Sequence, residues 1–201
     1  MKNVVPVTLA GRIVRLEPLS MSHLGGLCAV GLDESIWKLM PYTPVTSRER
    51  MVAQIEDLLG RQARGTDLPF TVILQATGAP VGMTRYLDIQ PANQALEVGG
   101  TWYGVAYQRT GVNTESKFLI LRHAFETLEA MRVQIKTDLR NIRSQRAIER
   151  IGAVREGVLR EHMLLPDGTR RSSVYFSILV AEWPAVKQRL IDLMDRPAGQ
   201  W

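Results

Sequence analysis

The spacing of hydrophobic positions changes several times along the chain, so strands and helices are expected to follow one another. Polar and apolar residues alternate over 12–16, which is typical of a half-buried strand. Apolar residues then recur at three- and four-residue intervals over 21–30 and from Ser47 onward, which predicts two helices. Gly60 or Gly65 is expected to end the second helix. Ser47 is expected to cap the second of these helices.

The middle of the chain returns to the period of strands. Residues 70–74, 81–89 and 96–103 predict three consecutive strands. Gly99 and Gly100 fall inside the last of them. A glycine pair at this place indicates a bulge, or another group lying close to the backbone.

A long helix is expected over 114–129, because an apolar stripe runs along it. The stripe consists of Phe118, Leu121, Phe125 and Leu128. The rest of the chain predicts a strand over 132–136, a helix from Asn141 to Ile151 closed by Gly152, strands over 154–164 and 173–179, and a helix from Glu182.

The resulting order is β-α-α-β-β-β-α-β-α-β-β-α. It predicts an α/β fold with a mixed sheet of about seven strands and helices on both faces. The 201 residues suit one domain, and no internal repeat or low-complexity tract divides them. We therefore expect a single domain over 1–201, with its core at about 10–190 and a frayed tail over 196–201.

Composition narrows the class of protein. With 45% hydrophobic residues the chain does not resemble disordered proteins, and no apolar stretch approaches the roughly 20 residues needed to span a membrane. Residues 1–10 do not resemble a signal peptide, because Pro6 interrupts the apolar run and Arg12 follows soon after it. Cys28 is the only cysteine, which excludes an internal disulfide and a cysteine-rich zinc site. A cytoplasmic protein is expected.

Arginine dominates the basic residues. The 25 Lys and Arg exceed the 20 Asp and Glu by five, and only five of the 25 are lysine. Because guanidinium groups bind phosphate with two parallel hydrogen bonds, an anionic partner is one interpretation and a solvated surface is the other. No nucleic-acid-binding motif is present, so direct nucleic-acid binding is not expected.

The loop before the long helix is the first candidate site. It reads Gln108-Arg109-Thr110-Gly111-Val112-Asn113-Thr114. The first amides of a helix lack helical partners and carry positive potential, so this loop suits an anion such as a phosphate. The alternative is an ordinary glycine-containing turn that Asn113 or Thr114 caps.

A second segment adds to the first, and together they resemble a known family. Gln108 and Gly111 form a Q-x-x-G core, and Asn141, Ser144, Ala147 and Gly152 form N-x-x-S-x-x-A-x-x-x-x-G after the next strand. In this order they resemble the GNAT acetyltransferase superfamily, in its RimJ/RimL-like (Acetyltransf_3-type) branch. Residues 12–19, the Leu165-Pro166-Asp167-Gly168 turn and Glu182-Trp183-Pro184 are similar to that branch too.

The resemblance implies a GNAT fold with a mostly antiparallel sheet, and acetyl-CoA as co-substrate without a metal. It implies that the CoA pyrophosphate lies on the amides from Arg109 to Thr114 and that pantetheine runs along Thr101–Tyr103 as an added strand. Asn113 stands where such loops usually have Gly or Ala. The implied cofactor-binding residues are Thr101, Trp102, Tyr103, Gln108, Arg109, Thr110, Gly111, Val112, Asn113, Thr114, Asn141 and Ser144.

The resemblance also implies direct transfer, in which a base deprotonates the substrate ammonium and the amine attacks the thioester. Glu97 occupies the strand position of the base in several members, and the alternative is a surface carboxylate. Glu161 and His162 are further candidates. Ile148 replaces the tyrosine that protonates the leaving thiolate in many members, so Ser144 is the candidate acid; alternatively it is an ordinary first-turn helix residue.

Other candidates carry two interpretations each. Arg140, Arg143 and Arg146 either meet the 3′-phosphate of CoA or form a solvated helix face. Trp37, Met40, Tyr42 and Trp102 either line an acceptor pocket or pack in the core. His23, His123 and His162 have no metal-ligand spacing.

The sequence thus predicts an acetyl-CoA-dependent N-acetyltransferase. Its acceptor is expected to be a primary amine: a protein N-terminus, such as that of a ribosomal protein, or a small molecule such as an antibiotic or polyamine. The alternatives are a CoA-binding regulatory module without catalysis and a nucleic-acid-binding domain. Relatives are usually dimeric, so a homodimer is compatible with the resemblance.

Overall fold

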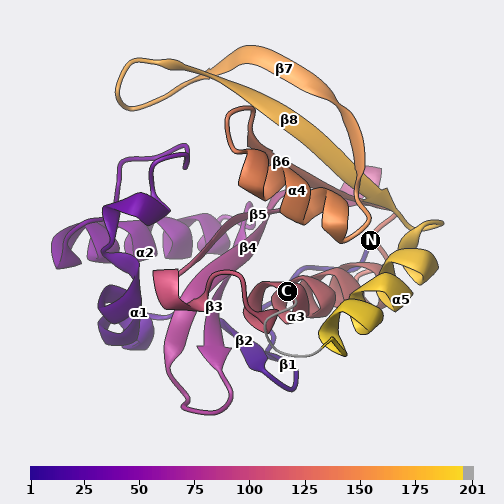
Figure 1. Ribbon diagram of the computed structural model, residues 1–201, viewed down its shortest axis with the longest axis horizontal. Helices are drawn as coiled ribbons and strands as arrows, with labels where there is room; N and C mark the ends of the chain where they lie inside the picture. The colour runs from indigo at the N-terminus through magenta and orange to yellow at the C-terminus, as the bar shows by residue number, and fades with distance from the viewer. Residues whose placement is uncertain (197–201) are drawn as a thin grey trace.

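Eight strands form one sheet in the computed structural model of the chain (Figure 1), which describes residues 1–196. The sheet order is β1-β2-β3-β4-β5-β6-β8-β7. The strands are β1 (Leu9–Ala10), β2 (Val14–Pro18), β3 (Leu68–Leu74), β4 (Pro80–Gln90), β5 (Ala95–Tyr103), β6 (Arg132–Asp138), β7 (Val154–Leu164) and β8 (Arg170–Leu179).

The mixed sheet with helices on both faces is confirmed, with eight strands rather than about seven. The additional strand, β1, has two residues, which pair with Leu16 and Arg15. Two residues are too few to show a period of two, so the sequence pattern could not reveal this strand. A frayed tail was expected over 196–201, and residues 197–201 of it lie outside the described part of the chain.

Five α-helices within residues 1–196 cover the sheet. Helices α1 (Leu24–Gly31) and α2 (Arg48–Ala63) pack on one face, in a hydrophobic cluster that includes Met83 and Trp102. The other face carries α3 (Gly111–Arg122), α4 (Ile142–Arg150) and α5 (Trp183–Met194). No helix within residues 1–196 is long and apolar enough to cross a membrane.

The predicted helix caps are largely confirmed. The Ser47 hydroxyl accepts the Arg50 N–H at the start of α2, and the Asn141 side chain accepts the Ser144 N–H at the start of α4. Gly152 follows α4 with a φ of +100°, which a glycine adopts without strain.

Helix α3 differs from its prediction at both ends. It begins at Gly111, three residues before the expected start, and Thr110 caps it by accepting the Val112 N–H; the caps expected at Asn113 or Thr114 are wrong. It ends in a π-helical turn over His123–Thr127 instead of continuing to 129. The Tyr86 hydroxyl donates to the Ile120 carbonyl just before this turn, and a side chain that bonds into a helix end favours such irregular turns.

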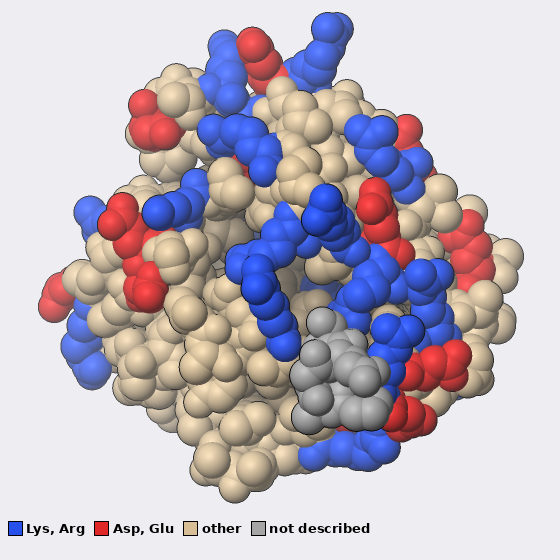
Figure 2. Space-filling model, in the orientation of Figure 1, with Lys and Arg blue, Asp and Glu red and all other residues tan. Residues whose placement is uncertain are grey.

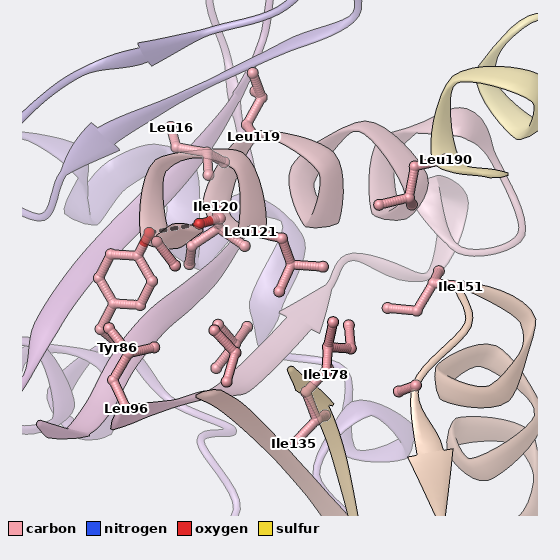
Figure 3. Close-up of a cluster of buried hydrophobic side chains, with 14 of the residues drawn as sticks. Leu16, Tyr86, Leu96, Leu119, Ile120, Leu121, Ile135, Ile151, Ile178 and Leu190 are labelled. Atoms are coloured by element: carbon pink, nitrogen blue, oxygen red, sulfur yellow. Dashed lines mark hydrogen bonds between the residues drawn. The ribbon is translucent and has the colours of Figure 1, made fainter. Parts of the chain in front are cut away.

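The core on the α3 side joins residues far apart in the sequence (Figure 3). Leu119, Ile120 and Leu121 of α3 lie against side chains from the sheet, α5 and the end of α4. Leu121, Phe125 and Leu128 of the predicted stripe are buried as expected. Phe118 is only half-buried, and the Arg122 guanidinium lies over its ring.

A buried carboxylate joins α3 to the first strands. Glu115 accepts the backbone N–H groups of Arg12, Ile13 and Val14 at 2.8, 2.6 and 2.7 Å. Gly11 fits beside it because a Cβ there would lie 2.6 Å from Glu115 Cδ. This contact fixes α3 against the sheet, and α3 begins at the candidate loop.

We predict that Glu115→Ala lowers the free energy of unfolding by about 3 kcal/mol or more, since it leaves three backbone donors without their charged acceptor. Urea denaturation measures this change. Glu56→Ala, at an exposed position of α2, is the matched control and should shift stability by less than about 0.5 kcal/mol. Equal effects of the two substitutions would contradict the structural role of Glu115.

Candidate functional site

A cavity of about 440 Å³ lies where β5 and β6 diverge. These strands form the only parallel pair among the described ones, and their pairing covers three positions, from Ala95–Arg132 to Glu97–Gln134. Trp102 and Met40 line the cavity from the α1–α2 side, whereas Lys117 of α3 and Ile148 of α4 line it from the opposite side. The cavity therefore extends through the sheet.

The edge of β5 that borders the cavity has free backbone groups. Beyond Glu97 it has no partner in β6, so N–H and C=O groups of the 98–103 segment remain available to an extended ligand. The bulge predicted at the glycine pair is confirmed: Arg85 pairs with Gly99, Met83 pairs with Trp102, and Gly100 has a φ of +56°. Thr101, Trp102 and Tyr103, which the resemblance assigns to pantetheine, line the cavity.

The predicted anion loop lies at the other end of this edge. Gln108, Arg109, Thr110 and Asn113 line the cavity. Gly111, Val112 and Thr114 are buried in the first turn of α3 and do not contribute to the lining. The Gln108 amide donates to the Tyr103 carbonyl and accepts from Arg143 at 2.7 Å, which links β5, the loop and α4.

Cationic side chains dominate the lining. Only one carboxylate, that of Glu97, lines the cavity within the described part of the chain. Figure 2 shows Lys and Arg side chains over α4 and around the hollow beside it. The eight lining cations are Arg85, Arg109, Lys117, Lys136, Arg143, Arg146, Arg150 and Arg171.

Only some of the arginines in and just before α4 line the cavity. Arg143 and Arg146 line the cavity, whereas Arg140 is bound to Asp138 and does not. Arg150, at the end of α4, donates to the Thr114 hydroxyl at 2.9 Å. Sequence reasoning missed Arg150, because its partner lies 36 residues earlier in the chain.

Lys117 is a buried cation that the sequence analysis also missed. Its side chain is 7% exposed, and its ammonium donates to the Thr101 hydroxyl at 2.8 Å without an ion pair to any described carboxylate. Burial lowers the pKa of this ammonium to about 8. Helical spacing was the available signal, since Asn113 and Lys117 are four residues apart and share a helix face.

Glu97 lies at the last parallel pair, where the strands begin to diverge. It is 2% exposed, so the alternative of a surface carboxylate is wrong. Its Oε2 accepts from Lys136 Nζ and Gln134 Nε2, both at 2.9 Å. Its Oε1 accepts no hydrogen bond from another described residue, so this oxygen remains available to a ligand or water.

Ser144 and Asn141 both line the cavity at the start of α4. The Ser144 N–H is bonded to the Asn141 cap at 3.0 Å, while its hydroxyl makes no hydrogen bond to another described residue. Ile148 lines the cavity one turn further along α4. The hydroxyl of Ser144 is thus free to donate to a ligand at this place.

The alternative bases do not line the cavity. Glu161 and His162 are exposed on β7. The His162 ring lies 5.9 Å from the Tyr175 ring; partial burial lowers the His162 pKa, and the charges of Lys136 and Arg171 lower it further. Both residues are therefore less well placed than Glu97.

The candidates for an acceptor pocket separate into one core residue and three cavity-lining residues. Trp37 is fully buried against Trp102 and donates to the Gly31 carbonyl, so it is a core residue. Met40, Tyr42 and Trp102 line the cavity. Within residues 1–196, no group of three His, Cys, Asp or Glu side chains is arranged to hold a metal ion.

We predict that Lys117→Met raises the free energy of unfolding at pH 7 by about 1–3 kcal/mol, because it removes the cost of burying an ammonium. Between about pH 8 and 10, the unfolded chain keeps a proton on Lys117 that the folded chain releases, so wild-type stability should rise with pH relative to the variant. Urea denaturation at several pH values measures both effects. A constant difference from pH 7 to 10 would contradict the lowered pKa.

Comparisons with known proteins agree with this geometry. A family model described as an acetyltransferase (GNAT) domain, Acetyltransf_3, matches residues 14–154. A Bacillus subtilis (strain 168) protein named "Putative ribosomal N-acetyltransferase YdaF" is 31% identical over 110 residues, 55% of this chain and 59% of that protein. The match thus spans less than two thirds of that relative.

Solved structures extend the likeness over nearly the whole chain. A GCN5-related N-acetyltransferase from Brucella melitensis is 30% identical, with a TM-score of 0.89 over 96% of this chain and 87% of that one. RimJ of Mycobacterium smegmatis, solved in complex with CoA-disulfide, shares the fold at 21% identity, with a TM-score of 0.79 over 94% and 95% of the two chains. The chain therefore belongs to the GNAT acetyltransferase family, as the residues of the loop and of α4 had indicated.

Proposed function

We propose that this protein transfers an acetyl group from acetyl-CoA to the primary amine of an acceptor. The observation that carries the proposal is the cavity between β5 and β6, with eight cations and one carboxylate in its lining. A cationic lining suits the phosphates of CoA, and a single buried carboxylate suits removal of a proton from an ammonium.

The residues present fit CoA. The first turn of α3 provides amides without helical partners, and Arg109, Arg143, Arg146 and Arg150 line the cavity from the loop before α3 and from α4. The free edge of β5 suits the amides of pantetheine. The thioester of acetyl-CoA supplies the acyl group.

Glu97 is the proposed base. Its free Oε1 accepts a proton from the acceptor ammonium, directly or through a water, while Lys136 and Gln134 hold the carboxylate through Oε2. The amine nitrogen then bonds to the acetyl carbon and the carbon–sulfur bond breaks. Amides on the free edge of β5 stabilise the carbonyl oxygen as it gains charge, and the Ser144 hydroxyl donates to the leaving sulfur.

Two kinds of acceptor are candidates. YdaF is named for a ribosomal substrate, which supports a protein N-terminus. A small-molecule amine is the second candidate. A CoA-binding module without catalysis is the alternative function, and Ile148, in place of a tyrosine acid, is the observation in its favour.

Release of free thiol from acetyl-CoA in the presence of an amine panel tests the proposed activity. We expect amine-dependent release, together with a rise in melting temperature on addition of acetyl-CoA, since a ligand that binds only the native state stabilises it. A rise in melting temperature without thiol release would support the binding module. Absence of both would contradict the proposal.

We predict that Gly111→Ala weakens acetyl-CoA binding about tenfold or more, because a Cβ in the buried first turn of α3 would displace the amides that are proposed to hold the phosphates. Isothermal titration calorimetry measures the affinity. Gly25→Ala is the matched control, since a Cβ at Gly25 in α1 would meet nothing within 4 Å. Wild-type affinity in Gly111→Ala would show that this loop does not hold the pyrophosphate.

We predict that Glu97→Gln lowers kcat by about 10²- to 10⁴-fold, the usual contribution of a general base, with little change in the affinity for acetyl-CoA. Steady-state kinetics with calorimetry measures both quantities. Glu161→Gln, on exposed β7, should retain wild-type turnover. If Glu161→Gln or a His162 variant lost activity while Glu97→Gln kept the wild-type pH–rate profile, the base would lie on β7.

A further inference from the structure

The wall of the cavity on the α1–α2 side has a charge pattern that CoA binding does not explain. We call this wall the acceptor wall; it consists of Leu39, Met40, Tyr42, Arg85 and Arg171. The two arginines come from β4 and β8, on opposite sides of the diverging strands. The predicted phosphate loop lies on the α3–α4 side instead.

Arg85 is a guanidinium without hydrogen bonds to any described residue. Its side chain is only 14% exposed, and its Nε forms an ion pair with Asp67 Oδ1 at 3.2 Å, without the geometry of a hydrogen bond. Because a buried donor without a hydrogen bond costs about 1–3 kcal/mol, such a group calls for an explanation, and a ligand or an ordered water can supply the missing acceptor.

Arg171 is buried still more deeply, with 5% of its side chain exposed. Its Nε donates to the Ser173 hydroxyl at 2.9 Å, and its Nη1 reaches the Leu39 carbonyl at 3.4 Å. The nearest carboxylate, Asp138, is 3.9 Å away and already accepts two hydrogen bonds from the Arg140 guanidinium. Arg171 therefore shares the Asp138 carboxylate with Arg140 and makes no hydrogen bond to it.

The two arginines face the same space as Glu97. Arg85, Arg171, Tyr42 and Glu97 line the same cavity. Burial raises the pKa of the Tyr42 hydroxyl, and the charges of Arg85, Arg171 and Arg61 oppose that rise. Leu87 pairs with Glu97 and Arg85 pairs with Gly99, which places Arg85 and Glu97 on one face of the sheet. As diagonal neighbours on adjacent strands, their Cα atoms are about 7–8 Å apart.

We propose that Arg85 and Arg171 bind a carboxylate of the acceptor, which is therefore an amine that carries a carboxylate within a few bonds of its nitrogen. The inference rests on the proposed function and specifies its substrate class. A carboxylate would satisfy the free N–H groups of both guanidinium groups, since arginine binds carboxylates through two parallel hydrogen bonds. The amine at the other end of the acceptor would then meet Glu97 Oε1.

The same wall disfavours acceptors with several positive charges. Lys136 already pairs with Glu97, and the acceptor wall offers no carboxylate to bind a second ammonium. A polyamine would bring like charge against two buried arginines. The carboxylate could belong to a small amino acid or to an acidic side chain next to a peptide N-terminus. The experiment tests these two classes of acceptor separately.

The test compares acceptors that differ only in one charge. The small-molecule arm uses β-alanine and β-alaninamide; the peptide arm uses Ala-Asp-Ala-amide and Ala-Asn-Ala-amide. In the pair that resembles the acceptor, we expect the compound with the carboxylate to have at least a tenfold higher kcat/KM than its amide. Calorimetry should also show that this compound binds the CoA-loaded protein more tightly. Arg171→Gln and Arg85→Gln should abolish this preference mainly through KM, and exposed Arg64→Gln should retain it.

If the carboxylate and amide compounds of both pairs had equal kcat/KM and equal affinity, the inference would be overturned. The proposed function would remain valid, because acetyl transfer would still occur. If no amine were acetylated, the proposed function would fail, and calorimetry would still decide the binding of the acid against the amide. Circular dichroism confirms folding of the variants. If a variant fails to fold, the comparison of carboxylate and amide acceptors with the wild-type protein still tests the inference.

Discussion

The pairing between β5 and β6 stops after Glu97 and Gln134, and the site depends on that interruption. A sheet that stayed paired along its whole length would close the cavity and satisfy the edge of β5 that now remains free. Two local features accompany the divergence. Gly100 adopts a left-handed conformation at the bulge of β5, and Arg85 packs where a Cβ of residue 100 would lie. The ion pair between Glu97 and Lys136 lies at the point where the strands separate.

The same divergence brings charged groups from both faces of the sheet into one cavity. Cations from α3 and α4 border one side, and those from β4 and β8 border the other. Burying a cation costs folding free energy, and burial accordingly lowers the pKa of the Lys117 ammonium. Bound anions would offset that cost for the lining cations that form no ion pair within the described residues, such as Lys117, Arg143 and Arg146. Stability and ligand affinity are therefore expected to change in opposite directions when these cations are replaced.

Local periodicity was sufficient to predict most of the elements, because strands and helices of ordinary length repeat their pattern several times. It failed for β1, which has two residues, and for the ends of α3, which depend on Thr110 and on the Tyr86 contact with Ile120. The loop and the start of α4 could be found because their residues lie within one short segment each. Arg85 and Arg171 could not, since they join Tyr42 only after three distant segments have folded together. The burial of Glu97 likewise follows from its position between β4 and β6 and not from its own neighbours in the sequence.

Hydrogen–deuterium exchange with and without acetyl-CoA tests most directly whether the diverging strands hold the cofactor. If pantetheine adds to the free edge of β5 and the pyrophosphate lies on the start of α3, amide exchange should slow over 98–103 and 109–114, while α2 stays unchanged. Protection confined to other segments, with binding confirmed by calorimetry in the same sample, would show that acetyl-CoA binds elsewhere and would contradict the proposed site.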